Sequence, residues 1–360
     1  MRQATLHVTY NGRAVTNSFA DSNLDFTYTD APSGELDDIT IRMVDMAGNW
    51  RGKWIPAEGD QLQIAIEVMD WQKHGDGKRK HHCGSFLVDS VTVQGPPDIV
   101  EIRAASYPVS SDSKQQKRSK VWEKVKLSTI ANDIAQRAKL KLISEVAIDP
   151  TYDRIEQQEQ TDFAFLLDLS TKEGIALKVT DGKLVMFDEA RFERGKPVAI
   201  YRPDDGLLLD YSFEWSSANC AYGACEITYE ETEKASINDD TKKETGKKKK
   251  GRKKTVKKSK KVTYVPPGAP KTGPILRIKE SAGSQAEALR IARNRLREQN
   301  KQANRASITV LGDIRIASSV VVVLDGLGRF SSRYIVDSVT HQIGSSGYTS
   351  RLEIRKVLGW

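Results

Sequence analysis

The sequence predicts a mainly β protein in which an α+β unit separates two β units. Short runs of alternating apolar and polar residues fill the first 105 residues and return after Leu207, at a spacing typical of small β-barrels or sandwiches. Between these regions, apolar residues recur at i, i+3 and i+4, as on an amphipathic helix. A third region is rich in Lys, Gly and Pro and almost free of apolar side chains, which predicts disorder. With 360 residues, the chain has room for two or three domains.

The first β unit is expected over residues 1–107. Its strands include Ala4–Tyr10, which the hairpin dipeptide Asn11-Gly12 follows, and an alternating run at Leu62–Val68. Residues 71–83 are expected to form a polar loop that leads into a strand.

The α+β unit is expected over residues 108–195. Ser128 is placed to cap a first helix, and Thr161 begins a second helix that ends at Gly174. The dipeptide Asp181-Gly182 predicts a type I′ hairpin between two β runs. The second helix is expected to place three apolar side chains in the core, namely Phe163, Leu166 and Leu167.

A second β unit is expected from residues 196–231 together with residues 305–360. Two segments interrupt it: a flexible Lys-rich insertion over residues 232–274 and a helical segment over residues 275–304. The helix is indicated by apolar residues on one face, at Ala288, Ile291, Ala292 and Leu296.

The net positive charge of the chain comes from the Lys-rich insertion. The formal net charge is +8, and the window from Lys242 to Lys261 holds 13 Lys or Arg against one acid, Glu244. That window therefore carries +12, and the remaining 340 residues carry −4. A solvated, self-repelling loop and a contact with an acidic partner or DNA are equally compatible with this pattern. The side chains that would make such a contact are Lys247, Lys248, Lys249, Lys250, Arg252, Lys253, Lys254, Lys257 and Lys258.

The lengths of the apolar runs exclude membrane-spanning and secreted proteins. The longest runs, Phe163–Leu167 and Val320–Leu324, have five residues. A membrane span needs about 20 and the core of a secretory signal needs about 7–15. Three cysteines cannot all pair within one chain, which favours assembly in a reducing cytoplasm.

The sequence contains no motif of an enzyme or a cofactor site: GxSxG, P-loop and GxGxxG patterns are absent. Metal-capable side chains cluster at His74, His81, His82 and Cys83. They lack a second ligand pair, and His81 and His82 would face opposite sides of an extended strand. His341, on an alternating strand, is expected to be structural rather than a catalytic base. We therefore expect neither an enzyme nor a bound metal or cofactor.

Five segments of the chain occur in the same order as similar segments of one known protein family. They are Leu36–Glu67 with its Trp-x-Pro-x-x-Gly-x-x-Leu run, Gly84–Ser106, Ser119–Ala138, Gln160–Gly174 and Ile308–Leu352. The most specific is QTDFAFLLDLSTKEG at Gln160–Gly174, which is followed by DGKL. This order resembles the phage late control D proteins, which are tail baseplate hub proteins. That family is similar to the hub of T-even phages and to the head of type VI secretion spike proteins. The resemblance does not extend to the Lys-rich insertion.

The resemblance implies two tube-like β-barrels with an α+β domain between them. It also implies a function: a homotrimeric ring adapts the hexameric tail tube to the trimeric central spike in a contractile phage tail or a related injection particle. Such a protein assembles in the host cytoplasm and becomes part of the virion baseplate. Its partners would be the tail tube protein and the central spike protein. The tape-measure protein and other baseplate proteins are further candidates, DNA would be touched only in passage, and no catalysis is implied.

Two other classes of function are compatible with parts of the sequence. A nucleic-acid-binding protein could act through the Lys-rich segment, although no aromatic residue for base stacking occurs in it before Tyr264. Some hubs of this type carry a lysozyme insert, but residues 232–274 are too short and too polar to fold as a hydrolase domain. A trimer in solution would favour the hub, and a monomer would favour the nucleic-acid binder.

Overall fold

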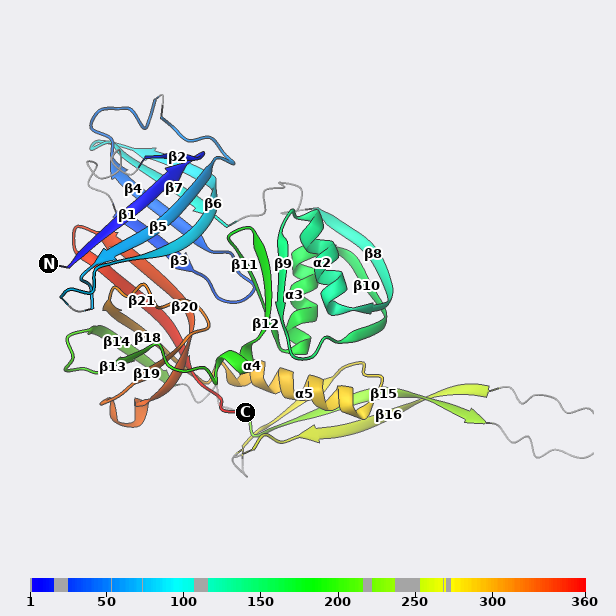
Figure 1. Cartoon of the computed structure of the whole chain (residues 1–360). Coiled ribbons are helices and arrows are strands. Elements are labelled where there is room, and N and C mark those ends of the chain that lie inside the picture. The colour runs from blue at the N-terminus through cyan, green and yellow to red at the C-terminus, as the bar shows by residue number, and fades with distance from the viewer. Residues whose placement is uncertain are drawn as a thin grey trace, which may run out of the picture. The chain divides into compact units, whose positions relative to one another are not determined.

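The protein is described by a computed structural model that divides into two compact units (Figure 1). Unit 1 contains Met1–Trp215 and Asn304–Gly359, and unit 2 contains Ser216–Ala303 with Trp360. The described residues are 2–15, 25–52, 54–72, 74–106, 116–215, 222–236, 253–267, 269 and 273–360. No helix among them is long and apolar enough to cross a membrane.

Seven strands are described in the first β unit. They are β1 (Gln3–Tyr10), β2 (Arg13–Ala14), β3 (Asp25–Asp30), β4 (Asp38–Val44), β5 (Gln61–Met69), β6 (Lys78–Gln94) and β7 (Ile99–Ala105). The predicted turn at Asn11-Gly12 is confirmed, since both residues have the positive φ angles of a type I′ turn. The loop expected over residues 71–83 is shorter than predicted. β6 begins at Lys78 because Lys78 is already in register with Met69 of β5.

The α+β unit contains β8 (Lys117–Lys126), α2 (Leu127–Arg137), β9 (Lys141–Glu145), β10 (Thr151–Thr161), α3 (Asp162–Glu173), β11 (Ile175–Thr180), β12 (Lys183–Asp188) and α4 (Glu189–Phe192). Strands β8 and β10 pair with each other, and β9, β12 and β11 form a second small sheet. The apolar faces of α2 and α3 share one core with these strands. The hairpin at Asp181-Gly182 is confirmed between β11 and β12.

The start of α3 agrees with the prediction and the start of α2 does not. Thr161 accepts a hydrogen bond from the backbone N–H of Ala164, and Gly174 ends α3 in the left-handed conformation. Ser128 lies inside α2 rather than at its N-cap. Its N–H and hydroxyl both donate to the carboxylate of Asp149, which therefore satisfies the backbone at this helix end from another segment.

The second β unit contains β13 (Ala199–Tyr201), β14 (Leu208–Trp215), β18 (Asn304–Leu311), β19 (Val321–Leu324), β20 (Ser332–Gly344) and β21 (Gly347–Lys356), with the 3-10 turn η2 (Gly328–Phe330) before β20. Residues 224–231, which were expected to belong here, pair with strands of unit 2 instead.

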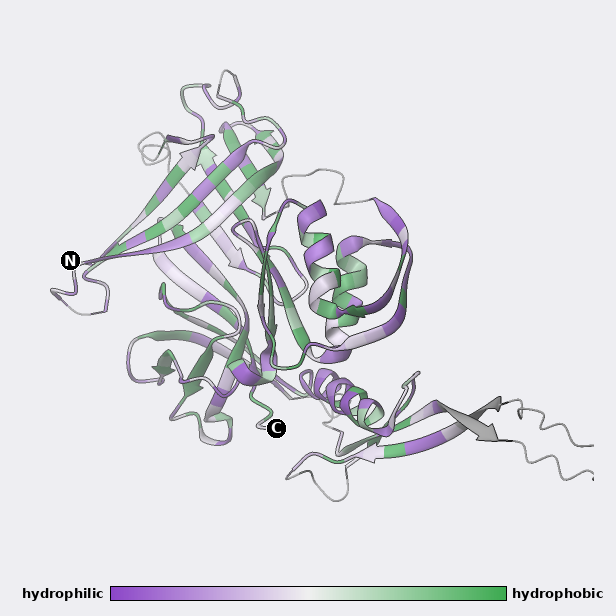
Figure 2. Cartoon of the chain, turned by 45° about the vertical axis from the view of Figure 1, so that its right-hand side comes forward, coloured by the Kyte–Doolittle hydropathy of each residue, from purple (hydrophilic) through white to green (hydrophobic). Residues whose placement is uncertain are grey.

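One 13-stranded sheet runs through both β units, with the strand order β14-β18-β21-β20-β3-β4-β7-β6-β5-β1-β2 and with β19 and β13 as a branch from β20. β20 pairs with β21 along one side. On its other side it pairs first with β19 and then, through Val339–Ile343, with β3. The prediction of a mainly β fold with an α+β unit is confirmed. The two β units, which were expected as β-barrels, each have a core and are hydrogen-bonded to each other. Figure 2 shows hydrophobic and hydrophilic residues alternating along many of these strands.

Unit 2 is a small α+β fold built on a long hairpin. β15 (Ala224–Ser236) pairs with β16 (Lys253–Tyr264) on one side and with β17 (Ile275–Lys279) on the other. Apolar residues of α5 (Gln285–Asn300) share a core with apolar residues of β15. The disorder predicted for residues 232–274 is therefore wrong for the two parts of this range that form strands, which are residues 232–236 of β15 and the whole of β16. Val262 and Tyr264 pack against the buried residues of β15 and α5, which anchors this strand. The segment predicted as helical from residue 275 begins with a strand, and the helix starts only at Gln285.

The burial of α3 leads to a stability prediction. Phe165 is 4% exposed and stacks on Trp122 at 5.4 Å between ring centroids, whereas Phe163 is only partly buried. We expect Phe165→Ala to lower the free energy of unfolding by about 3–5 kcal/mol and Phe163→Ala to lower it by less. Denaturant unfolding of the two variants beside the wild type measures both values. A larger loss for Phe163→Ala would contradict the burial seen here.

Candidate functional site

The pairing of β20 with β3 is the place where the two β units meet, and we call it the internal joint. It brings Val339, His341 and Ile343 opposite Asp30, Tyr28 and Phe26. His341 stacks on Tyr28, with ring centroids 5.8 Å apart and planes inclined by 10°. Both side chains are buried. The contact fixes the relation between the two β units.

A polar cluster from the α+β unit closes one end of the internal joint. The ammonium of Lys178, on β11, pairs with Asp30 and lies 3.1 Å from a carboxylate oxygen of Asp37. It also donates to the hydroxyl of Ser318 at 2.7 Å. Ser318 in turn donates to Asp30 from its N–H and its hydroxyl. One lysine therefore joins both β units and the α+β unit.

Burial raises the pKa of Asp37 to about 6, although the ammonium of Lys178 acts in the opposite direction. The carboxylate also accepts a hydrogen bond from the backbone N–H of Ala31. Nothing in the sequence indicated the role of Lys178, because its partners lie more than 100 residues away and on both sides of it.

His341 has the structural role that the sequence predicted. Its Nε2 lies 3.3 Å from the carbonyl oxygen of Ile316, which can only accept, so Nε2 carries the proton. Nδ1 is then an acceptor, and the hydroxyl oxygens of Tyr348 and Ser350 lie 2.8 and 2.9 Å from it. Burial, with a smaller contribution from His81, lowers the pKa of His341 to about 4. The imidazole is therefore neutral at physiological pH.

The four side chains considered as metal ligands do not converge. His81 is half-buried with its ring centroid 6.1 Å from that of His341, whereas the next residue, His82, is exposed on the opposite face of β6. Cys83 is buried and His74 is 92% exposed. In the described part of the chain, no group of three or more His, Cys, Asp or Glu is placed to hold a metal ion.

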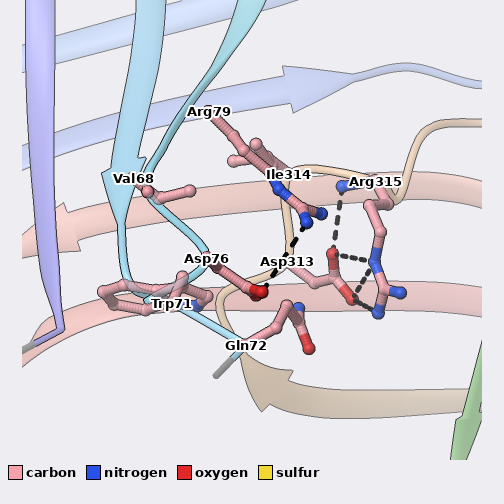
Figure 3. Close-up of a pocket in the computed structure, with 9 residues that line it drawn as sticks. Val68, Trp71, Gln72, Asp76, Arg79, Asp313, Ile314 and Arg315 are labelled. Atoms are coloured by element: carbon pink, nitrogen blue, oxygen red, sulfur yellow. Dashed lines mark hydrogen bonds and ion pairs between the residues drawn. The ribbon is translucent and has the colours of Figure 1, made fainter. Parts of the chain in front are cut away.

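Two hollows among the described residues of unit 1 were considered as ligand sites. The pocket in Figure 3 lies where Trp71 of the first β unit approaches residues 313–315 of the second, and it has room for about one water molecule. The indole N–H of Trp71 donates to the carbonyl of Gly312, and Asp313 forms a bidentate ion pair with Arg315. A second, open groove over β1, β5 and β6 is polar and includes His7, Lys80 and His82. Neither has the enclosed apolar lining of a small-molecule site.

The nine basic residues predicted to contact a partner fall into two groups. Lys247, Lys248, Lys249, Lys250 and Arg252 lie outside the described residues. Lys253, Lys254, Lys257 and Lys258 lie on β16, where their backbones pair with Ser236, Ala235, Thr232 and Glu231 of β15. The second group is therefore displayed by a hairpin rather than by an unstructured loop.

The low pKa of His341 predicts a pH effect on stability. The unfolded chain protonates this imidazole near pH 6.5 and the folded chain only near pH 4, so its contribution to stability is lost as the pH falls from about 6.5 to about 4. Asp37, whose pKa is raised, acts in the opposite direction over an overlapping range and is present in every variant.

We expect His341→Gln to lose about 2–3 kcal/mol less than the wild type when the pH falls from 7 to 4. Chemical denaturation at a series of pH values measures this difference. His74→Gln, at an exposed site, is the matched control and should follow the wild type. Parallel pH curves for the wild type and His341→Gln would show that His341 is not held neutral.

The comparisons with known proteins agree with this architecture. Residues 59–347 match the model of the phage tail baseplate hub (GPD) family. The chain is 25% identical to a probable baseplate hub protein of Escherichia phage 186, over 96% of this chain and 91% of that protein. It is 28% identical to the probable baseplate hub protein of Escherichia phage P2, over 49% of this chain and 43% of that protein.

Two solved structures show the same fold over nearly the whole chain. A tail protein from Neisseria meningitidis MC58 has a TM-score of 0.68 at 12% identity and covers 99% of this chain and 98% of its own. The 43 kDa tail protein of prophage MuSo2 from Shewanella oneidensis has a TM-score of 0.66 at 12% identity, with 98% of each chain covered. Since the family model spans most of the sequence, the chain belongs to the phage tail baseplate hub family.

Proposed function

We propose that this baseplate hub protein forms a trimeric ring that adapts the hexameric tail tube to the trimeric central spike. The observation that carries the proposal is the presence of two β units in one chain, hydrogen-bonded side by side at the internal joint. Three such chains supply six β units, which matches a sixfold ring on one face and a threefold partner on the other. The place of the protein is the tail of the virion, as for its family.

The role is structural. One face of the ring would contact the tail tube protein and the other the central spike protein. The tape-measure protein and other baseplate proteins are further candidate partners, and DNA would be touched in passage. The polar groups described above serve the internal joint: Lys178 and His341 are both held by partners within the chain. We propose no catalytic step.

The trimer is tested by the mass of the purified protein. The chain has a mass of 40.2 kDa, and sedimentation equilibrium is expected to give three times this value. A mass that fits a monomer or a dimer at all concentrations would contradict the ring.

We also propose that the basic hairpin of unit 2 contacts an acidic partner in the particle. Residues 242–261 carry +12, while the remaining chain carries −4, so the segment that includes the first part of β16 is the one strongly cationic part of the sequence. Isolated two-stranded hairpins are marginally stable in water, and β15 and β16 pair as far as Ser236 and Lys253. A partner surface that neutralises the charge of the lysines on β16 would also stabilise this end of the hairpin. Such contacts are sequence-independent and sensitive to salt.

Charge-neutral variants test this contact without removing the strand. We expect the combined change Lys253→Gln, Lys254→Gln, Lys257→Gln and Lys258→Gln to leave thermal unfolding unchanged and to reduce the yield of particles in a complementation assay. The four corresponding Lys→Arg changes keep the charge and are the matched control. Removal of residues 242–252 should act in the same direction as the Gln variant.

Normal particle yield for the Gln variant and the deletion together would contradict the contact. Binding of poly-glutamate and of a DNA duplex to the purified protein, measured against salt concentration, then identifies the class of partner. Preferential binding of the duplex would favour a nucleic acid.

A further inference from the structure

The two β units repeat the same arrangement of five strands. β5, β6, β7, β4 and β3 of the first unit lie in the same order as β19, β20, β21, β18 and β14 of the second, and every neighbouring pair is antiparallel. The strands outside this set differ, since β1 is antiparallel to β5 but β13 is parallel to β19. The chain therefore contains an internal structural repeat.

The repeat can be aligned residue by residue along its longest strand. Phe86–Gln94 reads FLVDSVTVQ and Tyr334–Gln342 reads YIVDSVTHQ. Both strands carry a bulge at the Asp of VDS, where the register with the neighbouring strand shifts. The carbonyl before each bulge, in Val88 and Val336, accepts from a residue with positive φ, Gly59 in one unit and Ser319 in the other.

The alignment extends through the sheet to β3 and β14. The pairing places Tyr28 opposite Ile39 in one unit and Phe213 opposite Ala306 in the other. Asp25–Thr29, DFTYT, then corresponds to Asp210–Glu214, DYSFE. In agreement, Tyr28 contacts Phe86 and Phe213 contacts Tyr334, with ring centroids 5.9 and 6.4 Å apart.

The internal joint uses one edge from each repeat and leaves the two corresponding edges open. β20 reaches past the end of β19, and its last residues pair with β3. β6 likewise reaches past the end of β5, since its pairing with β5 stops at Leu87. On the side of β6 that faces β5, no described strand pairs with Val91–Gln94. β14, the counterpart of β3, is the terminal strand of the sheet among the described residues.

Exposure distinguishes the open edges from the internal joint. Val93 corresponds to His341, and Tyr211 corresponds to Phe26. His341 and Phe26 are fully buried in the internal joint, whereas Val93 is 42% exposed and Tyr211 is 49% exposed. Val93 and Tyr211 are therefore exposed to water at positions whose counterparts in the other repeat are buried in the internal joint.

We propose that β6 of one copy of this chain pairs in antiparallel fashion with β14 of a second copy, in the register of the internal joint. Val339, Thr340 and His341 pair with Asp30, Thr29 and Tyr28 within the chain. The corresponding register between copies places Val91, Thr92 and Val93 opposite Trp215, Glu214 and Phe213. The contact is heterologous, because it joins different surfaces of the two copies, and repetition of such a contact can close a ring. The closure at three copies rests on the proposed function, whereas the pairing rests on the repeat.

The register is tested by disulfide cross-linking. Thr92 and Glu214 are exposed, and the proposal places them opposite each other between copies. Thr92→Cys combined with Glu214→Cys should give disulfide-linked species on a non-reducing gel after mild oxidation. Thr92→Cys combined with Asp210→Cys is the control, because four residues along a strand separate the sulfurs by about 13 Å. Each single variant controls for the native cysteines.

The outcomes separate the pairing from the ring. Efficient cross-linking of the Thr92/Glu214 pair alone, with trimer as the largest species, supports both. Cross-linked species that extend beyond trimer retain the pairing and overturn the trimer. A protein that is trimeric by mass but does not cross-link, or that cross-links equally with Asp210→Cys, overturns the pairing and leaves the ring. A monomer that does not cross-link overturns both.

A second test uses charge at the open edge. Val93→Asp introduces a carboxylate at a site that is exposed in the single chain, so thermal unfolding of the monomer should be unchanged. In the assembled ring the carboxylate would be buried against Phe213, and the mass should fall from three times 40.2 kDa to 40.2 kDa. Val121→Asp, at a valine of similar exposure on β8, is the matched control and should remain assembled. A Val93→Asp protein that assembles like the control would overturn the proposal.

Discussion

The length of β20 is the constraint on which the arrangement of this protein depends. β19 has only four residues, so a strand of four residues would be enough to pair with it. β20 has 13 residues, and its second half pairs with β3. Because side chains alternate along a strand, this register also decides which residues enter the shared core. His341 and Tyr28 then stack in the interior, and the bulge at Asp337 adjusts the register with β21 before the joint begins. The position of one β unit against the other follows from this strand.

Local patterns predicted much of the fold, and contacts between distant segments accounted for what they missed. The turns at Asn11-Gly12 and Asp181-Gly182 and the start and end of α3 depend on a few neighbouring residues, and these predictions are confirmed. The cap of α2 was wrong because Asp149, 21 residues after Ser128, supplies the acceptor. The predicted disorder of Lys253–Tyr264 was wrong because pairing with β15 outweighs a composition that could not form a core by itself.

In the candidate site, too, the sequence predicted the role of one residue and missed the role of another. His341 could be assigned a structural role from its alternating strand, but Lys178 carried no sequence signal, since its partners Asp30 and Ser318 are 148 and 140 residues away. The repeat was accessible in the sequence, because VDSVT occurs twice at the same place in a strand. Only the pairing of the strands shows that its two copies are joined through unlike edges. The relation between the two copies is therefore head-to-tail.

The lysine that seals the internal joint has a consequence for assembly. Asp30 corresponds to Trp215 in the second repeat, so the ionic contact of Lys178 has no counterpart at the open edge of β14. The internal joint also forms between segments of one polypeptide, at an effective concentration set by chain length rather than by dilution. A ring built from these chains would thus alternate joints that persist when it dissociates with joints that depend on the amount of protein present. Its disassembly product would be the intact pair of β units, ready to close again without refolding.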